Sequence, residues 1–204
     1  LTSELVNAIG RLVHALQRER GLSNLYLGSQ GARGAAERQA QAAQCETLQA
    51  ELLAGFDRLD TETARGSNGA RLFSRIAYVL QGLDALPELR ARVVTQQWSA
   101  ARTTTAYIRL INGLLAVVFE AADGATDPDI SRHLVALFNF MQGKEFTGQE
   151  RATGAALFAA GRADADGQQR LLHLIDSQER CLRVFHDFAG STLQQLWHRV
   201  QRPE

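Results

Sequence analysis

The segment LVNAIGRLVHALQRERGLSNLYL, residues 5–27, decides the fold class. Its apolar residues recur every three or four positions, at Leu5, Ile9, Leu12 and Leu16. This spacing matches the turn of an α-helix and not the alternation of a strand. We therefore expect the chain to open with one long helix that runs to about Leu27.

The remainder of the chain repeats this helical periodicity. Three prolines in 204 residues leave few obligatory helix breaks. Asp127 followed by Pro128 has the cap and first-turn proline of a helix start. The further helices are expected at residues 35–59, 70–86, 88–122, 128 to 141 and onward, and 171–200. The helix at 88–122 can break within residues 99–107, and the last helix can bend near Gly190. No window alternates like a strand, so we predict an all-α protein of about six or seven helices.

Three features of this division are less sharply defined by the sequence. Residues 61–69 and 161–167 contain polar residues and glycines, and we expect both to be connections between helices. Glycines at positions 143, 148 and 154 leave open whether the helix that starts at Pro128 is one helix or two.

The composition excludes several classes of function. The chain has 22 basic residues (lysine and arginine) and 22 acidic residues (aspartate and glutamate), so its formal net charge is +0. A protein that coats nucleic acid or an anionic membrane carries a basic excess, which this chain does not have. Cys45 and Cys181 form neither a zinc motif nor a disulfide framework. No run approaches the ~20 apolar residues of a transmembrane helix.

We expect a single domain over residues 1–204 without direct membrane contact. Because the chain starts at Leu1 rather than Met, we expect it to be a piece of a longer protein.

Two arginines occupy positions where apolar residues are expected. On the first helix, the four-residue step after Leu16 falls on Arg20. Further along the chain, Leu137, Lys144, Arg151 and Phe158 are spaced by sevens, which puts Arg151 on a face of apolar and small residues. We therefore expect both arginines to face inward.

The local sequences around these two arginines correspond. Arg20 is preceded by Glu19 and followed by Gly21, and Arg151 is preceded by Glu150 and followed by Ala152. Adjacent residues point about 100° apart on a helix, so neither glutamate neutralises its neighbouring arginine directly. Small residues would let helices approach closely and leave room for a compact ligand.

Two inward guanidinium groups around a small space suit a small planar oxyanion. Each can donate two charge-assisted hydrogen bonds in one plane. At ~4 Å and an effective dielectric of ~20, each charge–charge interaction is on the order of 4 kcal/mol before desolvation. The competing interpretation is structural, since an arginine on an apolar stripe commonly extends to solvent or pairs with a carboxylate of another helix.

These residues resemble the family of nitrate- and nitrite-sensing (NIT) domains. The segment Leu12-Val-His-Ala-Leu-Gln-Arg-Glu-Arg-Gly-Leu-Ser23 is similar to the family's opening motif. The segment Gly148-Gln-Glu-Arg-Ala152 resembles the family's second motif. It is preceded by Lys144-Glu145 and followed by Phe158-Ala-Ala-Gly161. The two motifs stand about 130 residues apart, and the resemblance covers nearly the whole chain.

The resemblance implies an all-α sensor built as two stacked four-helix bundles, which binds nitrate or nitrite between the bundles. It implies a ligand-binding role for Arg20 and Arg151, with Gly21 and Ala152 beside them. Family members occur in cytoplasmic transcription antiterminators with an RNA-binding output domain, and in extracytoplasmic sensors of chemoreceptors or kinases. The lead-in Leu12-Val13-His14 favours the antiterminator type. We therefore expect a cytoplasmic location, a homodimer, and contact with RNA only through an output domain outside this chain.

Two other functions compete with a sensor. An enzyme is disfavoured because none of the five histidines stands in an HxxxH, HExxH or Glu-x-x-His arrangement, so we expect no catalytic residues, no metal and no cofactor. A helical scaffold that binds a partner protein and no small ligand is the more serious alternative. Trp98 and Trp197 would then be candidate interface residues, although we expect both to pack in the core. A response of stability to nitrate would distinguish the sensor from the scaffold.

Overall fold

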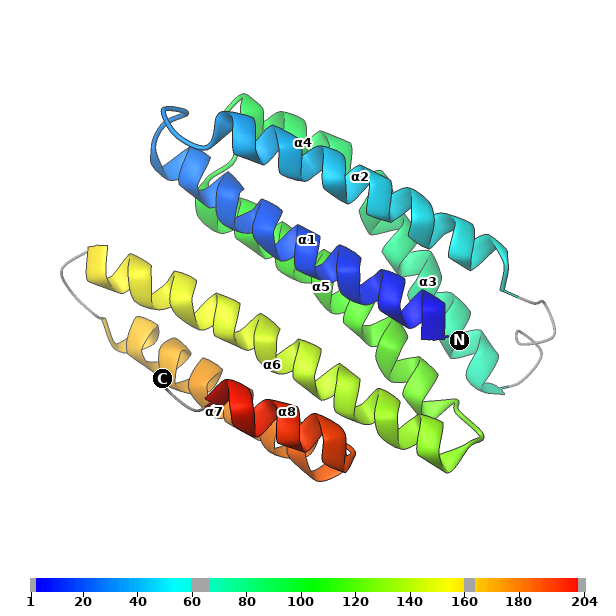
Figure 1. Cartoon of the computed structure of the whole chain (residues 1–204). Coiled ribbons are helices and arrows are strands. Elements are labelled where there is room, and N and C mark those ends of the chain that lie inside the picture. The colour runs from blue at the N-terminus through cyan, green and yellow to red at the C-terminus, as the bar shows by residue number, and fades with distance from the viewer. Residues whose placement is uncertain (1–2, 60–66, 160–163, 202–204) are drawn as a thin grey trace. The chain divides into compact units, whose positions relative to one another are not determined.

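The computed structural model describes residues 3–59, 67–159 and 164–201, and every regular element in these ranges is a helix. The prediction of an all-α fold is therefore confirmed. The helices, shown in Figure 1, are α1 (Ser3–Gly28), α2 (Ala35–Asp57), α3 (Ser67–Asp84), α4 (Leu86–Val94), α5 (Ala100–Asp123), α6 (Pro128–Ala159), α7 (Ala165–Phe188) and α8 (Ser191–Gln201).

The chain folds as two compact units, Leu1–Ala121 and Ala122–Glu204. We call these unit 1 and unit 2 and describe each by itself. The stacking of two four-helix bundles, and the assignment of residues 1–204 to a single sensor domain, stay predictions.

The first helix buries the stripe that defines it. Leu5, Ile9, Leu12 and Leu16 are all buried on α1. The turn that follows contains Gly34, whose φ of 79° lies in the left-handed region that favours glycine. α2 then returns along α1 (Figure 1), so the two helices form an antiparallel pair at the start of the chain.

The break between α4 and α5 comes earlier than the sequence suggested. The break was allowed at residues 99–107, but α4 ends at Val94 and α5 begins at Ala100. Gln96 has a φ of 55°, which no helix interior can contain. The Ser99 hydroxyl accepts a hydrogen bond from the backbone N–H of Arg102 at 3.2 Å, as an N-cap does. The Ser-Thr-Ala segment that follows is helical throughout.

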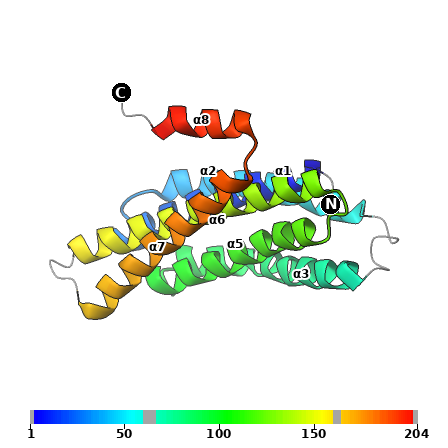
Figure 2. The same cartoon turned by 90° about the horizontal axis from the view of Figure 1, so that it is seen from below.

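Other boundaries shift by a few residues. α3 begins at Ser67 and α7 at Ala165, so the last residues of the connections expected at 61–69 and 161–167 are helical. Their remaining residues, 61–66 and 161–163, lie outside the described part of the chain. The chain reverses direction near Gly190, between α7 and α8 (Figures 1 and 2), where a bend was expected.

α6 is one helix, and its start is the one the sequence predicted. The Asp127 side chain accepts hydrogen bonds from the N–H groups of Asp129 and Ile130 at 2.8 and 3.2 Å. A Cβ at Gly143 would lie 3.3 Å from Cys181 and 3.4 Å from Leu182 of α7. Close packing between α6 and α7 therefore offsets the low helix propensity of this glycine.

The core of unit 2 includes an aromatic cluster that holds α8. Phe140 of α6, Phe185 of α7 and Trp197 of α8 have ring centroids 5.2 to 6.0 Å apart in pairs. Trp197 thus packs in the core of its own unit, which is the role expected of it outside an interface.

α5 is the most apolar of the described helices. It is long and apolar enough to cross a membrane by length and composition, and it is the one described helix that meets both criteria. However, 61% of its apolar window is buried inside the protein. Its burial is that of a core helix of unit 1.

Candidate ligand-binding site

Glu19 of the first Glu-Arg motif is a fully buried carboxylate of unit 1. Its side chain has 0% exposure, and Arg90 of α4 holds it through two hydrogen bonds, Nε to Oε1 at 2.7 Å and Nη2 to Oε2 at 3.0 Å. The hydroxyl of Tyr107 on α5 donates a third hydrogen bond to Oε1 at 2.9 Å. A buried charge requires such partners, so α1 is fixed in rotation against α4 and α5 at this residue.

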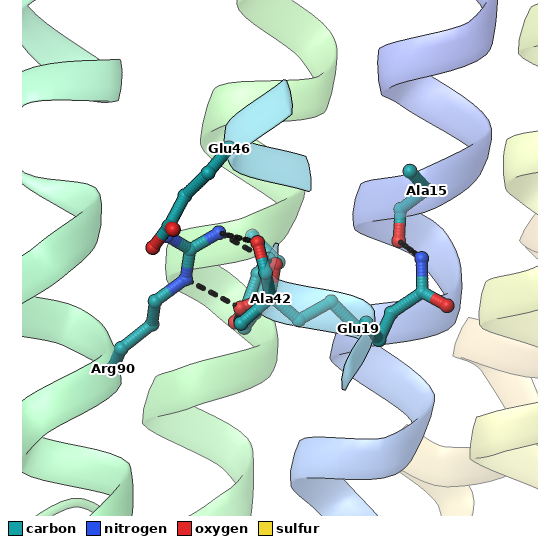
Figure 3. A network of polar contacts seen from close by, with 7 residues as sticks. Ala15, Glu19, Ala42, Glu46 and Arg90 are labelled. Atoms are coloured by element: carbon teal, nitrogen blue, oxygen red, sulfur yellow. Dashed lines mark hydrogen bonds and ion pairs between the residues drawn. The ribbon is translucent and has the colours of Figure 1, made fainter. Parts of the chain in front are cut away.

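Arg90 extends this network to α2, as Figure 3 shows. Its Nη1 donates to Glu46 at 3.0 Å, and its Nη2 lies 3.4 Å from the carbonyl oxygen of Ala42. Next to it, the Gln41 side-chain amide donates to the Ala15 carbonyl oxygen at 3.2 Å. The network therefore joins α1, α2, α4 and α5, which are four of the five described helices of unit 1.

The protonation states in this network follow from burial and from the Glu19 charge. Burial raises the pKa of Tyr107 well above its usual range, and the neighbouring Glu19 carboxylate raises it further. Burial and the same carboxylate also raise the pKa of the Cys45 thiol. Burial alone would lower the pKa of Arg90, but the hydrogen bonds and charge of Glu19 outweigh it and the pKa is raised. The arginine thus stays charged, while the phenol and the thiol keep their protons.

Arg20 directly follows Glu19 on α1. It is buried, as its position on the apolar stripe predicted. Because it is rotated about 100° from Glu19 around the helix axis, it leaves α1 in a different direction from the Glu19 network. Gly21 is exposed, and a Cβ built on it would meet no atom within 4 Å. The close helix approach that we expected at Gly21 is therefore not found.

Arg151 is in unit 2, and here the expectation of an inward position is wrong. Arg151 and Ala152 are exposed on α6, as is Lys144 two turns earlier on the same face. Phe158 is 91% exposed. The seven-residue spacing placed these residues on one face correctly, but the described part of unit 2 does not cover that face. A Cβ at Gly154 likewise meets no atom within 4 Å.

The glutamates of the two motifs behave alike. Glu150 is half-buried and accepts a hydrogen bond at 3.1 Å from the side-chain amide of Gln178 on α7, which also contacts Thr147. In both motifs the glutamate contacts a neighbouring helix and the arginine points elsewhere. By contrast, Arg180 of the third Gln-Glu-Arg sequence is exposed and donates to Ser177 within its own helix.

The predicted site residues are therefore divided between the two units. Arg20 and Gly21 belong to unit 1, and Arg151 and Ala152 belong to unit 2. The pairing of the two arginines around one ligand stays a prediction. In residues 3–59, 67–159 and 164–201, no three His, Cys, Asp or Glu side chains are grouped so that they could hold a metal ion.

Sequence reasoning missed Arg90 and Tyr107. Arg90 follows Leu89 on a short helix whose apolar residues include Leu86 and Val93, and it is buried with them. That position was a signal of the same kind as the one that identified Arg20. Tyr107 lay in a segment where a helix break was allowed, and nothing in the sequence alone pairs it with Glu19.

Three comparisons relate the chain to known proteins. The sequence model of the NIT family, described as nitrate and nitrite sensing, matches residues 11–204. A nitrate regulatory protein of Klebsiella oxytoca is 40% identical over 185 residues, which cover 91% of this chain and 46% of that protein. The solved structure of the NasR transcription antiterminator superposes with a TM-score of 0.88 at 37% identity, over 98% of this chain and 53% of the other. The chain thus spans about half the length of both relatives.

Proposed function

The chain belongs to the NIT family of nitrate- and nitrite-sensing domains, and on this basis we propose that Arg20 and Arg151 bind nitrate or nitrite and that a separate output domain receives the signal. The observation that carries the proposal is the setting of Arg20. It is a buried arginine whose preceding residue is fixed by three hydrogen bonds. Because Glu19 fixes this turn of α1, the backbone that carries Arg20 is ordered before a ligand binds.

The chemistry of arginine supports a small planar anion as the ligand. A guanidinium donates two parallel hydrogen bonds to an oxyanion, which a lysine cannot do. Beside the arginines, Gly21 has no side chain and Ala152 only a methyl group, so both leave space for the ligand. Millimolar to micromolar affinity needs only about −4 to −8 kcal/mol, a range that two charged contacts can supply.

The proposed switch follows from charge. An anion bound by Arg20 and Arg151 adds a negative charge that both guanidinium groups attract, so it favours the state in which both arginines contact it. The helices that follow α6 transmit the change. The anion shifts the equilibrium only by its preference for one state, and a 100-fold preference corresponds to about 2.7 kcal/mol.

The output that we propose is transcription antitermination in the cytoplasm. The relatives are named as a nitrate regulatory protein and a transcription antiterminator, and both are about twice as long as this chain. Contact with RNA is assigned to the output domain, because this chain has no basic excess.

A homodimer is also part of the proposal. Unit 2 exposes several large apolar side chains, which are Phe158, Leu172, Leu193 and Leu196. Exposed apolar side chains favour self-association when they form one surface. Sedimentation of the chain at increasing concentration tests this, and a monomer at every concentration would exclude a stable dimer of this chain.

Thermal unfolding in nitrate tests the sensor against a plain scaffold. At constant ionic strength, replacing chloride by nitrate should raise the melting temperature progressively, because the ligand binds only the folded state. The same series on the Arg109→Ala variant, which changes an exposed arginine of α5, should give the same rise. Equal melting temperatures in nitrate and chloride would exclude the proposed function for this chain.

A further inference from the structure

The Gln-Glu-Arg sequence of α7, residues 178–180, has no part in the nitrate site proposed above. Glu179 and Arg180 are exposed, and Arg180 donates a hydrogen bond to Ser177 of its own helix. Gln178 is half-buried, and its side chain contacts α6 at two residues. In this sequence the glutamine therefore faces a neighbouring helix.

The side chain of Gln178 bridges two positions on α6. Its amide nitrogen donates to Glu150 Oε2 at 3.1 Å, and its carbonyl oxygen accepts from the hydroxyl of Thr147. Thr147 and Glu150 are three residues apart, so they lie on one face of the helix. Because a carboxylate only accepts hydrogen bonds, the NH2 end of the amide faces Glu150 and the carbonyl end is left for the hydroxyl.

These two hydrogen bonds belong to the packing between α6 and α7, which run antiparallel in unit 2 (Figures 1 and 2). Residues of α6 that contact α7 follow one stripe with helical spacing, Gly143, Thr147, Glu150 and Leu157. Packing of glycine and leucine is not directional, whereas hydrogen bonds are. Gln178 therefore fixes the rotation of α6 against α7 at the level of Glu150.

The residue after Glu150 is Arg151, which is rotated about 100° from it around the helix axis. The direction in which Arg151 leaves α6 is therefore set once Glu150 is held against α7. The glutamine of the second motif has no such effect, because the Gln149 amide donates along α6 to Glu145 at 2.8 Å. That contact lies within one helix and does not orient it against another.

We propose that Gln178 is a positioning residue of the nitrate site. It holds Glu150, and through Glu150 it holds the turn of α6 that carries Arg151. The inference rests on the proposed function, because it assigns Gln178 a role in nitrate binding at Arg151. Arg90 has the corresponding place in unit 1, where it holds Glu19 on the turn that carries Arg20.

Nitrate titrations of Gln178→Leu and Gln178→Glu test the proposal by calorimetry on the whole chain at constant ionic strength. Leucine keeps the approximate size and removes both hydrogen bonds, and glutamate puts a second carboxylate against Glu150. Losing a hydrogen bond behind a ligand-binding group costs about 10–100-fold in affinity at metal sites, and we expect each variant to bind nitrate about tenfold more weakly. Gln169→Glu makes the same chemical change on an exposed glutamine of α7 and should bind nitrate as the unmodified chain does.

The exchange variant Glu150→Gln/Gln178→Glu decides whether Gln178 acts through Glu150. It keeps the net charge of the chain and restores the hydrogen bond with donor and acceptor reversed. The new carboxylate on α7 accepts from the new amide on α6 with one oxygen and from Thr147 with the other. Nitrate affinity should return to that of the unmodified chain, and this recovery also covers the case in which Gln178→Leu packs differently.

Melting temperatures without nitrate separate positioning from a purely structural role. A lower melting temperature of Gln178→Leu with unchanged nitrate affinity of the folded protein overturns the proposal. An exchange variant that binds nitrate no better than Gln178→Glu overturns it as well. No binding by the unmodified chain contradicts the proposed function and this inference together, which is a different result from nitrate binding that does not depend on Gln178.

Discussion

Arg90 and Glu19 form a two-point ion pair in the core of unit 1, with Nε 2.7 Å from Oε1 and Nη2 3.0 Å from Oε2. The pair joins residues 71 positions apart in the sequence. It sets the rotation of α1 at the residue before Arg20, so a core interaction and the proposed ligand contact depend on the same helical turn.

Replacing Glu19 by Gln should destabilise the protein strongly. The substitution leaves the Arg90 charge buried with only the exposed Glu46 as an ionic partner, and breaking a buried pair in this way costs about 3–5 kcal/mol. Glu46→Gln is the matched control, because Glu46 contacts the same arginine but its side chain is 66% exposed. We expect that control to cost less than about 1 kcal/mol. Urea unfolding measures both, and equal losses would mean that Glu19 does not anchor the network.

Removal of the Tyr107 hydroxyl should have a smaller but clear effect. Tyr107→Phe keeps the ring and deletes one hydrogen bond to a charged, buried acceptor, which is worth about 1.5–3 kcal/mol. Tyr78→Phe makes the same chemical change on an exposed residue of α3 and should change stability by less than about 0.5 kcal/mol. If the two variants unfold at the same urea concentration, the hydrogen bond from Tyr107 to Glu19 contributes nothing to the folded state.

Cys45 should make stability fall at alkaline pH. Burial raises its pKa in the folded state, so above about pH 8.5 the unfolded chain loses this proton and the folded protein keeps it. The contribution of the protonated Cys45 thiol to the free energy of unfolding is therefore fully present below pH 8.5 and decreases above it. At pH 9.5 the decrease is about 1.4 kcal/mol. The measurement is urea unfolding at pH 7.5 and 9.5 under reducing conditions.

The Cys45→Ala variant isolates that contribution. The variant should be less stable at both pH values, because the substitution leaves a cavity. Between pH 7.5 and 9.5, however, its free energy of unfolding should fall by about 1.4 kcal/mol less than that of the unmodified chain. Cys181→Ala is the comparison for a thiol that is only partly buried. An identical pH dependence in Cys45→Ala and the unmodified chain would contradict the burial of a neutral thiol at this position.

The elements with strong periodicity could be predicted from sequence, and those decided by tertiary contacts could not. α1 and α2 lie within two residues of the predicted ranges, because apolar stripes and a glycine turn define them locally. The continuity of α6 through Gly143 depends on its packing against Cys181 of another helix, which no local pattern reveals. The break between α4 and α5 depends on the conformation of Gln96, a residue with no strong turn preference.

The candidate site shows the same division. The position of Arg20 on the apolar stripe predicted its burial, which the structure has. The same reasoning failed for Arg151, because a shared face says nothing about whether another element covers it. Arg90 could be suspected from its apolar neighbours, but its partner Glu19 is 71 residues away and only the fold brings the two together.

Calorimetry of nitrate binding tests the central claim most directly. The chain, Arg20→Ala and Arg151→Ala are titrated with nitrate at constant ionic strength, with Arg109→Ala and Arg183→Ala as controls that remove exposed arginines from α5 and α7. We predict saturable binding to the unmodified chain and both controls, and a loss of at least about tenfold in affinity in each test variant. Unchanged affinity in folded Arg20→Ala or Arg151→Ala would contradict the claim that the two Glu-Arg motifs form the nitrate site.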